Sequence, residues 1–158
     1  MRLCRPGLAL GIVVLTVSAW VPGVVRAQET AGQEDEVMAA AETFVRAFND
    51  LEWETFEASW AEDATAFFPM PGRDRRLEGR DAVVGAFQEI FGDFPEREPG
   101  PPYLSIRPLD VHVQVTDRTA VVTFHLGDAP PYNRRTLVLE KRAGRWLIVH
   151  LHASRPPG

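Results

Sequence analysis

Apolar residues in the first part of the chain recur at steps of three and four, the spacing that places them on one face of an α-helix. This pattern predicts three helices: one from Val37 to Leu51, a short one over residues 53–60, and one that starts near Arg80. Residues 64–68 predict a strand between the second and third helices, because a Pro-rich turn at 69–72 follows them. Residues 93–102 contain four prolines and a glycine, and we expect a loop there.

The period of the apolar pattern changes at residue 109, where apolar and polar positions begin to alternate as in a β-strand. Residues 109–115 and 120–126 predict one hairpin that turns at Asp117–Arg118, and residues 134–154 predict a second that turns at Ala143–Gly144. Helices followed by antiparallel strands indicate an α+β domain. Regular alternation gives the second hairpin one face with Arg134, Thr136, Val138, Leu147, Val149, Leu151 and Ala153, and another with Arg135, Leu137, Leu139, Trp146, Ile148, His150 and His152.

The second hairpin is apolar on both faces, although a single sheet packed against helices buries only one of them. We therefore expect a homodimer formed across the outer face of the sheet, with Trp146 near its centre. The alternative is a surface on which a tryptophan and two leucines stay half-exposed. The predicted dimer face consists of Leu137, Leu139, Trp146, Ile148, His150 and His152.

The first 27 residues have the pattern of a secretory signal peptide. Arg2 and Arg5 precede an apolar run, and the stretch Val25-Arg26-Ala27 offers small residues where a signal peptidase reads. The alternative is an uncleaved anchor helix, although Pro22-Gly23 interrupts it. We expect a signal peptide at 1–27, a polar disordered lead-in at 28–36 and a folded domain at 37–156, in a protein that is exported to the periplasm or secreted.

Charge and cysteine content narrow the classes of partner. The chain has 17 basic and 22 acidic residues, and loss of the predicted leader leaves 14 basic residues and a net charge of −8. This charge argues against binding to nucleic acid or to anionic membrane surfaces, which need a basic face. The one cysteine, Cys4, lies in the leader, so the mature domain has no disulfide. The sequence predicts no cofactor.

Three stretches carry a resemblance to a known superfamily: WAEDAT at residues 60–65, LEGRDA at 77–82 and GRWLIVHLHAS at 144–154. Their order and spacing resemble the SnoaL-like members of the nuclear transport factor 2-like superfamily, and the last stretch also resembles the association domain of calcium/calmodulin-dependent protein kinase II. The resemblance covers residues 34–156. It implies a cone in which a curved antiparallel sheet wraps around three helices, a deep apolar cavity and frequent dimers. It implies no single function, because this fold hosts many.

Ketosteroid isomerase, another member of the superfamily, allows a test of catalytic residues. Its chemistry needs a carboxylate base, a tyrosine and a protonated aspartic acid. The positions that resemble these fall on Phe68, Phe44 and Thr136, which cannot replace them. The sequence therefore argues against that activity and favours an apolar binding pocket. We expect the pocket to be lined by Phe44, Phe48, Trp60, Phe68, Tyr103, Arg134, Thr136 and Leu151.

Three polar features carry alternatives. Arg134 would hold an anionic group of an otherwise apolar ligand, unless it reaches solvent from the start of its strand. A one-residue shift in the hairpin would exchange Arg134 for Arg135 and turn His150 and His152 inward. These two histidines have ligand-like spacing but no third ligand, so we predict no metal site. Asp63 resembles a catalytic carboxylate, but its position between a helix and a strand favours a capping or turn role.

The sequence leaves three hypotheses for function. We prefer an exported SnoaL-like binding module with an apolar pocket for a small hydrophobic or weakly anionic molecule. An enzyme of the same fold, such as an isomerase, dehydratase or hydrolase, would need an acid–base pair in the pocket. A pure homo-oligomerisation domain would use only the outer face of the last hairpin.

Overall fold

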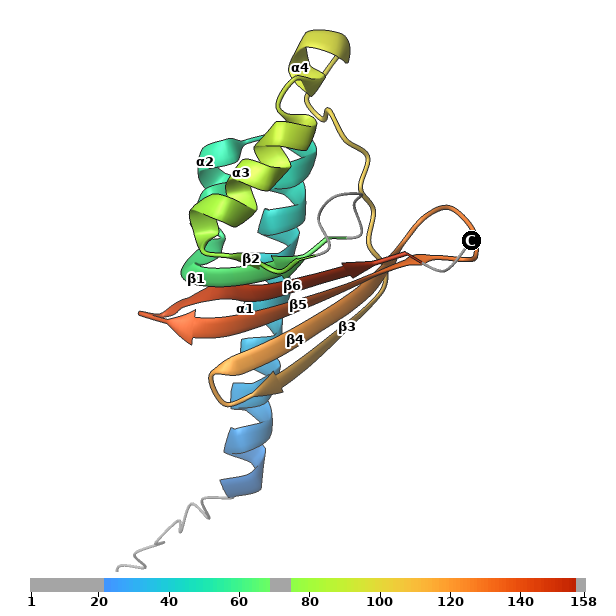
Figure 1. Cartoon of the computed structure of the whole chain (residues 1–158). Helices are drawn as coiled ribbons and strands as arrows, with labels where there is room; N and C mark the ends of the chain where they lie inside the picture. The colour runs from blue at the N-terminus through green and yellow to red at the C-terminus, as the bar shows by residue number, and fades with distance from the viewer. Residues whose placement is uncertain (1–21, 69–74, 156–158) are drawn as a thin grey trace, which may run out of the picture.

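Helices dominate the first half of the chain and strands the second half (Figure 1). The computed structural model describes residues 22–68 and 75–155, with side chains from residue 30 onward within these ranges. The elements are α1 (Pro22–Asp50), α2 (Trp53–Ala58), β1 (Trp60–Phe67), β2 (Leu77–Glu78), α3 (Arg80–Phe91), α4 (Phe94–Arg97), β3 (Leu109–Thr116), β4 (Thr119–Leu126), β5 (Asn133–Arg142) and β6 (Arg145–Ser154). Strand β2 and the single turn α4 were not predicted from the sequence.

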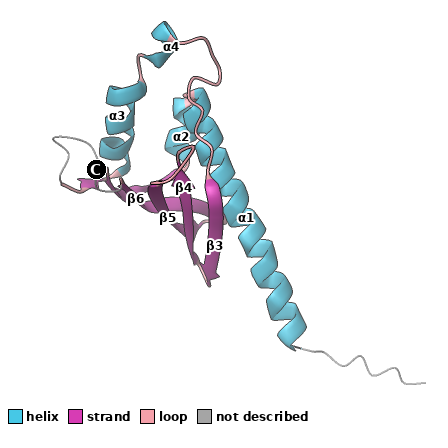
Figure 2. Cartoon of the chain, turned by 90° about the vertical axis from the view of Figure 1, so that its right-hand side faces the viewer, coloured by secondary structure: helices cyan, strands magenta, loops and turns pink. Residues whose placement is uncertain are grey.

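The strands form one curved, unclosed sheet with the order β2-β1-β6-β5-β4-β3. Strands β3 to β6 pair antiparallel as predicted, but β1 runs parallel to β6, so the sheet is mixed. The helices lie on one side of the sheet, and no described helix covers its other side (Figures 1 and 2). The predicted α+β cone, with helices from the N-terminal half packed on a curved sheet, is confirmed.

Both predicted hairpin turns are present, at residues 117–118 and 143–144. Ala143 and Gly144 both have positive φ, 47° and 79°, which is the geometry of a tight type I′ turn. At the far end of β3, Asp110 also has positive φ, 52°, and the register shifts there. Leu109 rather than Asp110 therefore lies opposite His125, as expected when a bulge adds one residue to a strand.

A second irregularity, in β6, decides which residues face the helices. Residues 138 and 139 of β5 pair with residues 150 and 148 of β6, so Val149 is an extra residue that forms a β-bulge. Before the bulge Trp146 and Ile148 are buried, and after it Leu151 and Ala153 are buried. The bulge thus brings onto one face the apolar residues that regular alternation had divided between two.

The same register sets the faces of β5, and the prediction for that strand was wrong. Leu137 and Leu139 are buried under the helices. Arg135 lies on their side of the strand, whereas Arg134 is exposed on the opposite side. The second hairpin therefore has one strongly apolar face, as a sheet covered by helices on one side requires.

Aromatic side chains from α1, α2, α3 and β1 form the centre of the core. Phe56 of α2 has no exposed surface. Its ring centroid lies between 4.9 and 5.9 Å from the rings of Phe44, Phe48, Trp53, Trp60 and Phe87. Each such pair adds about 0.5–1.5 kcal/mol to the effect of burial. Since the chain after residue 4 has no cysteine, this packing supplies stability that a disulfide cannot.

Helix α1 extends well before the predicted start at Val37. Residues 28–36, for which the sequence predicted a disordered lead-in, belong to this helix. Glu36 accepts a hydrogen bond from Nε1 of Trp146 (3.0 Å) and pairs with Lys141, so this part of α1 contacts the second hairpin. Of the predicted signal peptide, residues 1–21 lie outside the described residues. Within the described ranges, no helix combines the length and apolar character needed to cross a membrane.

Candidate functional site

A cavity of about 170 Å³ lies between the helices and the end of the sheet where β6 finishes. Its wall is almost wholly apolar and includes six phenylalanines. Two arginines provide the charged part of the wall. The lining residues are Phe44, Val45, Phe48, Phe68, Phe87, Ile90, Phe91, Ile106, Phe124, Leu126, Arg135, Leu151, Ala153 and Arg155.

The phenylalanines reach the cavity because of their spacing on the helices. Phe44 and Phe48 are one turn apart on α1, as are Phe87 and Phe91 on α3, so each pair projects from one side of its helix. The Phe48 ring lies edge-to-face with both rings of α3 at 5.0 Å. Phe68, just after β1, meets Phe87 at 4.7 Å in the same geometry. The wall is therefore a network of packed rings, which holds its shape through mutual contacts.

Arg135 enters this apolar wall from β5. Its side chain is half-buried, and its Nη1 donates to the backbone oxygens of Arg134 (2.8 Å) and Ser154 (3.4 Å). Burial lowers the pKa of Arg135, and the charge of Arg155 lowers it further. An arginine nevertheless stays protonated in proteins. Among the described residues, Arg135 forms no ion pair with a carboxylate.

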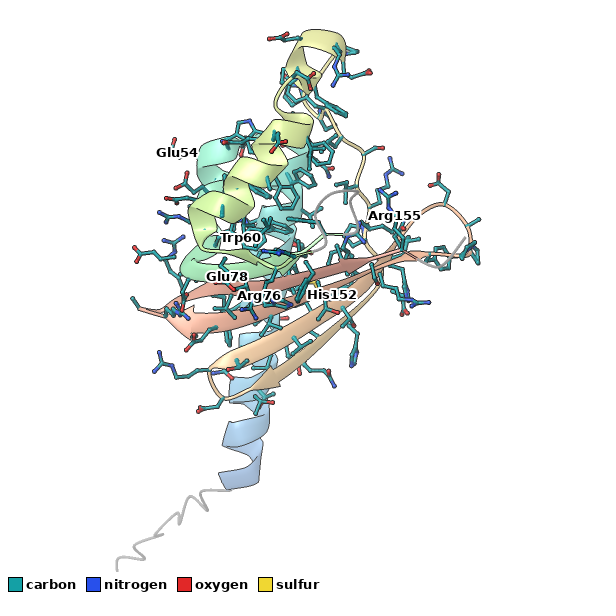
Figure 3. All side chains as sticks on the ribbon, in the orientation of Figure 1. Glu54, Trp60, Arg76, Glu78, His152 and Arg155 are labelled. Atoms are coloured by element: carbon teal, nitrogen blue, oxygen red, sulfur yellow. The ribbon has the colours of Figure 1, made fainter. Side chains whose placement is uncertain are left out.

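Arg155 lies just beyond the end of β6 and is exposed (Figure 3). It lines the same cavity as Arg135, and its charge acts on Arg135. No ion pair joins Arg155 to a carboxylate in the part of the chain that the structure describes. One end of an apolar cavity thus carries two positive charges that lack a described counter-charge.

The residues that line the cavity beside Arg135 limit the reactions that could take place in it. None of the described residues that line the cavity is Asp, Glu, His, Cys, Ser, Thr or Tyr. General acid–base and nucleophilic catalysis both draw on these side chains. The arrangement is instead suited to holding an apolar body and an anionic group, because guanidinium groups bind carboxylates through paired charge-assisted hydrogen bonds.

A wider hollow of about 380 Å³ lies between α1 and β3, and its lining differs in character. Glu42, Arg46, Asn49 and Asp50 mix charges of both signs along its helical side. The Asn49 side chain already forms two hydrogen bonds with the backbone of Ile106. Its Nδ2 donates to the Ile106 oxygen (3.0 Å), and its Oδ1 accepts from the Ile106 N–H (2.8 Å). This hollow therefore shows no concentrated charge and no free amide for a ligand.

The sequence model of the SnoaL-like domain matches residues 37–157, most of the chain. The protein belongs to the SnoaL-like family. Among curated proteins, none matches the sequence significantly.

Several solved structures share the fold of this SnoaL-like protein. An NTF2-like protein of unknown function from Pseudomonas putida is 20% identical, with a TM-score of 0.67 over 81% of this chain and 89% of that one. A proposed dehydratase of the NTF2-like family from Streptomyces avermitilis is 22% identical, with a TM-score of 0.66 over 82% and 99%. The association domain of C. elegans CaMKII is 19% identical, with a TM-score of 0.59 over 79% and 97%. At these identities the likeness concerns the fold.

The structure of the SnoaL-like domain divides the predicted pocket residues into two groups. Phe44, Phe48, Phe68 and Leu151 line the cavity. Trp60 is instead buried deeper, 5.6 Å from the Phe44 ring, and Tyr103 is half-buried in the loop, where its N–H donates to Asn49. Arg134 and Thr136 lie on the outer face of the sheet, because the register of β5 turns Arg135 inward. Arg135 is thus the residue that the sequence named only as an alternative.

The predicted dimer face also needs correction. Leu137, Leu139, Trp146 and Ile148 belong to the buried core of the protomer, so they cannot form its outer face. His150 and His152 do lie on the outer face. Trp146 and Ile148 point inward, and the extra residue Val149 reverses the alternation, so that His150 and His152 point outward. Nδ1 of His150 is 2.8 Å from Oγ1 of Thr65, and both histidine rings lie about 6 Å from the Phe67 ring.

The possible metal site and Asp63 were the remaining candidates for function. Within the described ranges, no three His, Cys, Asp or Glu residues gather as a possible metal site. Asp63 lies within β1 rather than at a cap or turn, and its carboxylate accepts from Nη1 of Arg142 at 2.6 Å. That hydrogen bond lowers the pKa of Asp63. Asp63 therefore pairs across the sheet surface and does not line the cavity.

Proposed function

We propose that this SnoaL-like protein binds a small hydrophobic or weakly anionic molecule in the cavity beside Arg135. The observation that carries the proposal is a phenylalanine-lined cavity in which two arginines have no described counter-charge. A bound anion would supply that charge, and the packed rings would supply apolar contact. Ligand sites in proteins typically combine an apolar wall with a few polar groups in this way.

An enzymatic role has less support. Some similar structures carry names such as proposed dehydratase, and the fold hosts catalysts. Dehydration and isomerisation need a group that takes up and returns a proton. Because the described lining offers only arginine as an ionisable side chain, binding is the better-supported function.

Native mass spectrometry of gently purified protein tests the proposal. We expect a small molecule that leaves on denaturation, or saturable uptake of small hydrophobic probes such as 4-methylphenol when the protein is isolated empty. Ala153→Leu places a larger side chain in the cavity and should abolish binding. Thr136→Leu is the matched control, because it makes a similar change on the outer face of the neighbouring strand. Equal binding by both variants, or none by the wild type, would refute a ligand site here.

We also propose that the protein is exported, on the basis of the leader pattern in its first 27 residues. Expression of the full chain in a bacterial host, followed by N-terminal sequencing of the soluble product, tests this. A start at Gln28 in the periplasmic fraction supports export. A product that keeps residue 1 in the cytoplasm contradicts it.

We further propose a homodimer across the outer face of the sheet, centred on Phe67 and His152 rather than on Trp146. That face has no described helix over it, and the Phe67 side chain there is 38% exposed. The similarity to an association domain also favours assembly. Light scattering at micromolar concentration should give a dimer, which Phe67→Asp converts to a monomer. Leu109→Asp, at an equally exposed site on the edge strand β3, should leave the dimer intact. A monomeric wild type contradicts the proposal.

A further inference from the structure

The size of the cavity limits the ligand before its chemistry is considered. An apolar protein cavity of about 150 Å³ holds one benzene molecule. The volume beside Arg135 is about 170 Å³. One six-membered ring with a short substituent therefore fills it, and fused rings or long chains exceed it unless they extend into solvent.

The wall favours an aromatic ring over a flexible chain. Six phenylalanines surround the space, and those that touch one another do so mainly edge to face, with Phe68 and Phe87 at 4.7 Å. A ligand ring extends this pattern, since aromatic pairs gain energy from offset or edge-on contact beyond the area that they bury. A rigid ring also loses less conformational freedom on binding than an alkyl chain of equal volume.

The charged end of the cavity specifies the substituent. Arg135 sits at the sheet side, held by the backbone oxygens of Arg134 and Ser154, and Arg155 follows at the end of β6. Two guanidinium groups that act on each other electrostatically gain most from a ligand that places negative charge between them. A carboxylate matches the planar fork of a guanidinium and adds little volume to a ring.

We infer that the ligand is a monocyclic aromatic carboxylate, with its ring among the phenylalanines and its carboxylate held by Arg135 and Arg155. This assignment rests on the proposed binding function of the cavity and names the class of molecule that it takes. It also assigns roles: the rings supply affinity that is independent of charge, and the two arginines supply the preference for an acid.

Isothermal titration with phenylacetate and its neutral amide, phenylacetamide, tests the two roles separately. In the wild-type protein we expect phenylacetate to bind at least about tenfold more tightly than phenylacetamide, because charge-assisted hydrogen bonds are stronger than neutral ones. Arg135→Met should reduce that ratio to about threefold or less and leave the amide affinity nearly unchanged. Arg134→Met, the adjacent arginine on the outer face, should leave the ratio as it is. If Arg135→Met does not fold, Arg155→Met replaces it as the test variant.

The outcomes separate this inference from the function on which it rests. Equal affinity for acid and amide in the wild type overturns the role of the arginines. Binding of decanoate but not phenylacetate overturns the aromatic class while the cavity remains a ligand site. Failure of phenylacetate, phenylacetamide and decanoate to bind overturns the inference, and uptake of the neutral ring 4-methylphenol then decides the proposed function independently.

Discussion

Replacement of Arg135 by methionine should make the unliganded protein more stable. The guanidinium is half-buried in an apolar wall, faces the like charge of Arg155 and forms no ion pair with a described carboxylate. Methionine keeps much of the side-chain volume and packs against the phenylalanines without a desolvated charge. The variant gives up two hydrogen bonds to backbone oxygens, one of them long at 3.4 Å.

The expected gain follows from these opposing terms. Replacement of buried ionic groups by apolar ones of similar volume is often neutral or stabilising by about 1–4 kcal/mol. Arg135 keeps some contact with solvent and loses net hydrogen bonds worth about 1 kcal/mol, so the low end applies. We expect a rise in the free energy of unfolding of about 1 kcal/mol. With a slope of about 2 kcal/mol per molar urea, the midpoint shifts upward by about 0.5 M.

Urea unfolding followed by tryptophan fluorescence measures this shift, with Arg134→Met as the control. The control changes an exposed arginine on the outer face and should stay within about 0.5 kcal/mol of wild type. Saturating phenylacetate should raise the wild-type midpoint above that of Arg135→Met, because a ligand stabilises only the state that binds it. A lower midpoint for unliganded Arg135→Met would show that the arginine supports the fold, and would refute the view that it is kept for a ligand.

Substitutions at three other positions test separate parts of the structure. Phe56→Ala should cost about 3–5 kcal/mol in urea unfolding, because its fully buried ring contacts five others, and Phe56→Leu should cost less than half as much. Burial and the nearby charges of His152 and Arg76 lower the pKa of His150, so stability should fall as the pH drops below about 6.5, and His150→Gln should flatten that part of the thermal-melt profile. The hydrogen bond from Arg142 lowers the pKa of Asp63, so the contribution of this pair to the stability of the fold is complete above about pH 4 and is lost in stronger acid. Asp63→Asn should remove that loss from the thermal-melt profile without affecting ligand binding.

The helices and turns could be predicted from the sequence because their signals are local. Apolar residues at steps of three and four place Phe44 and Phe48 on one side of α1. Ala143–Gly144 allows the positive φ angles of a tight turn. The order of the elements, together with the quoted stretches, then indicated the α+β cone. The parallel pairing of β1 with β6 has no local signal, since it joins segments more than eighty residues apart.

The faces of the second hairpin could not be predicted because a bulge leaves no clear trace in an apolar strand. Val149 stands in an uninterrupted apolar run from Trp146 to Val149, where either register puts a suitable residue inside. One indication of the bulge is present in the sequence: regular alternation leaves many apolar residues on both faces of the second hairpin. Regular alternation makes that excess a dimer surface, whereas a bulge that gathers the apolar residues under the helices accounts for it within one protomer.

The continuous helix α1 was missed for a different reason. Residues 28–36 are polar and acidic and carry no apolar stripe, so composition alone indicates disorder. At the end of this segment Glu36 also makes contacts with the far end of the chain, since it accepts from Trp146 and pairs with Lys141. Contacts between residues so far apart in the sequence cannot be predicted from the segment itself.

The unclosed sheet has two edge strands, β2 and β3, whose outer backbone N–H and C=O groups could pair with a strand of another molecule. On one side β2 is only two residues long, which offers too few groups to template another strand. On the other side β3 bends at Asp110, which puts a kink and a charge between the exposed side chains of Leu109 and Val111. Both features disfavour growth of the sheet by addition of a strand at its edges, which is consistent with assembly through a face of the sheet.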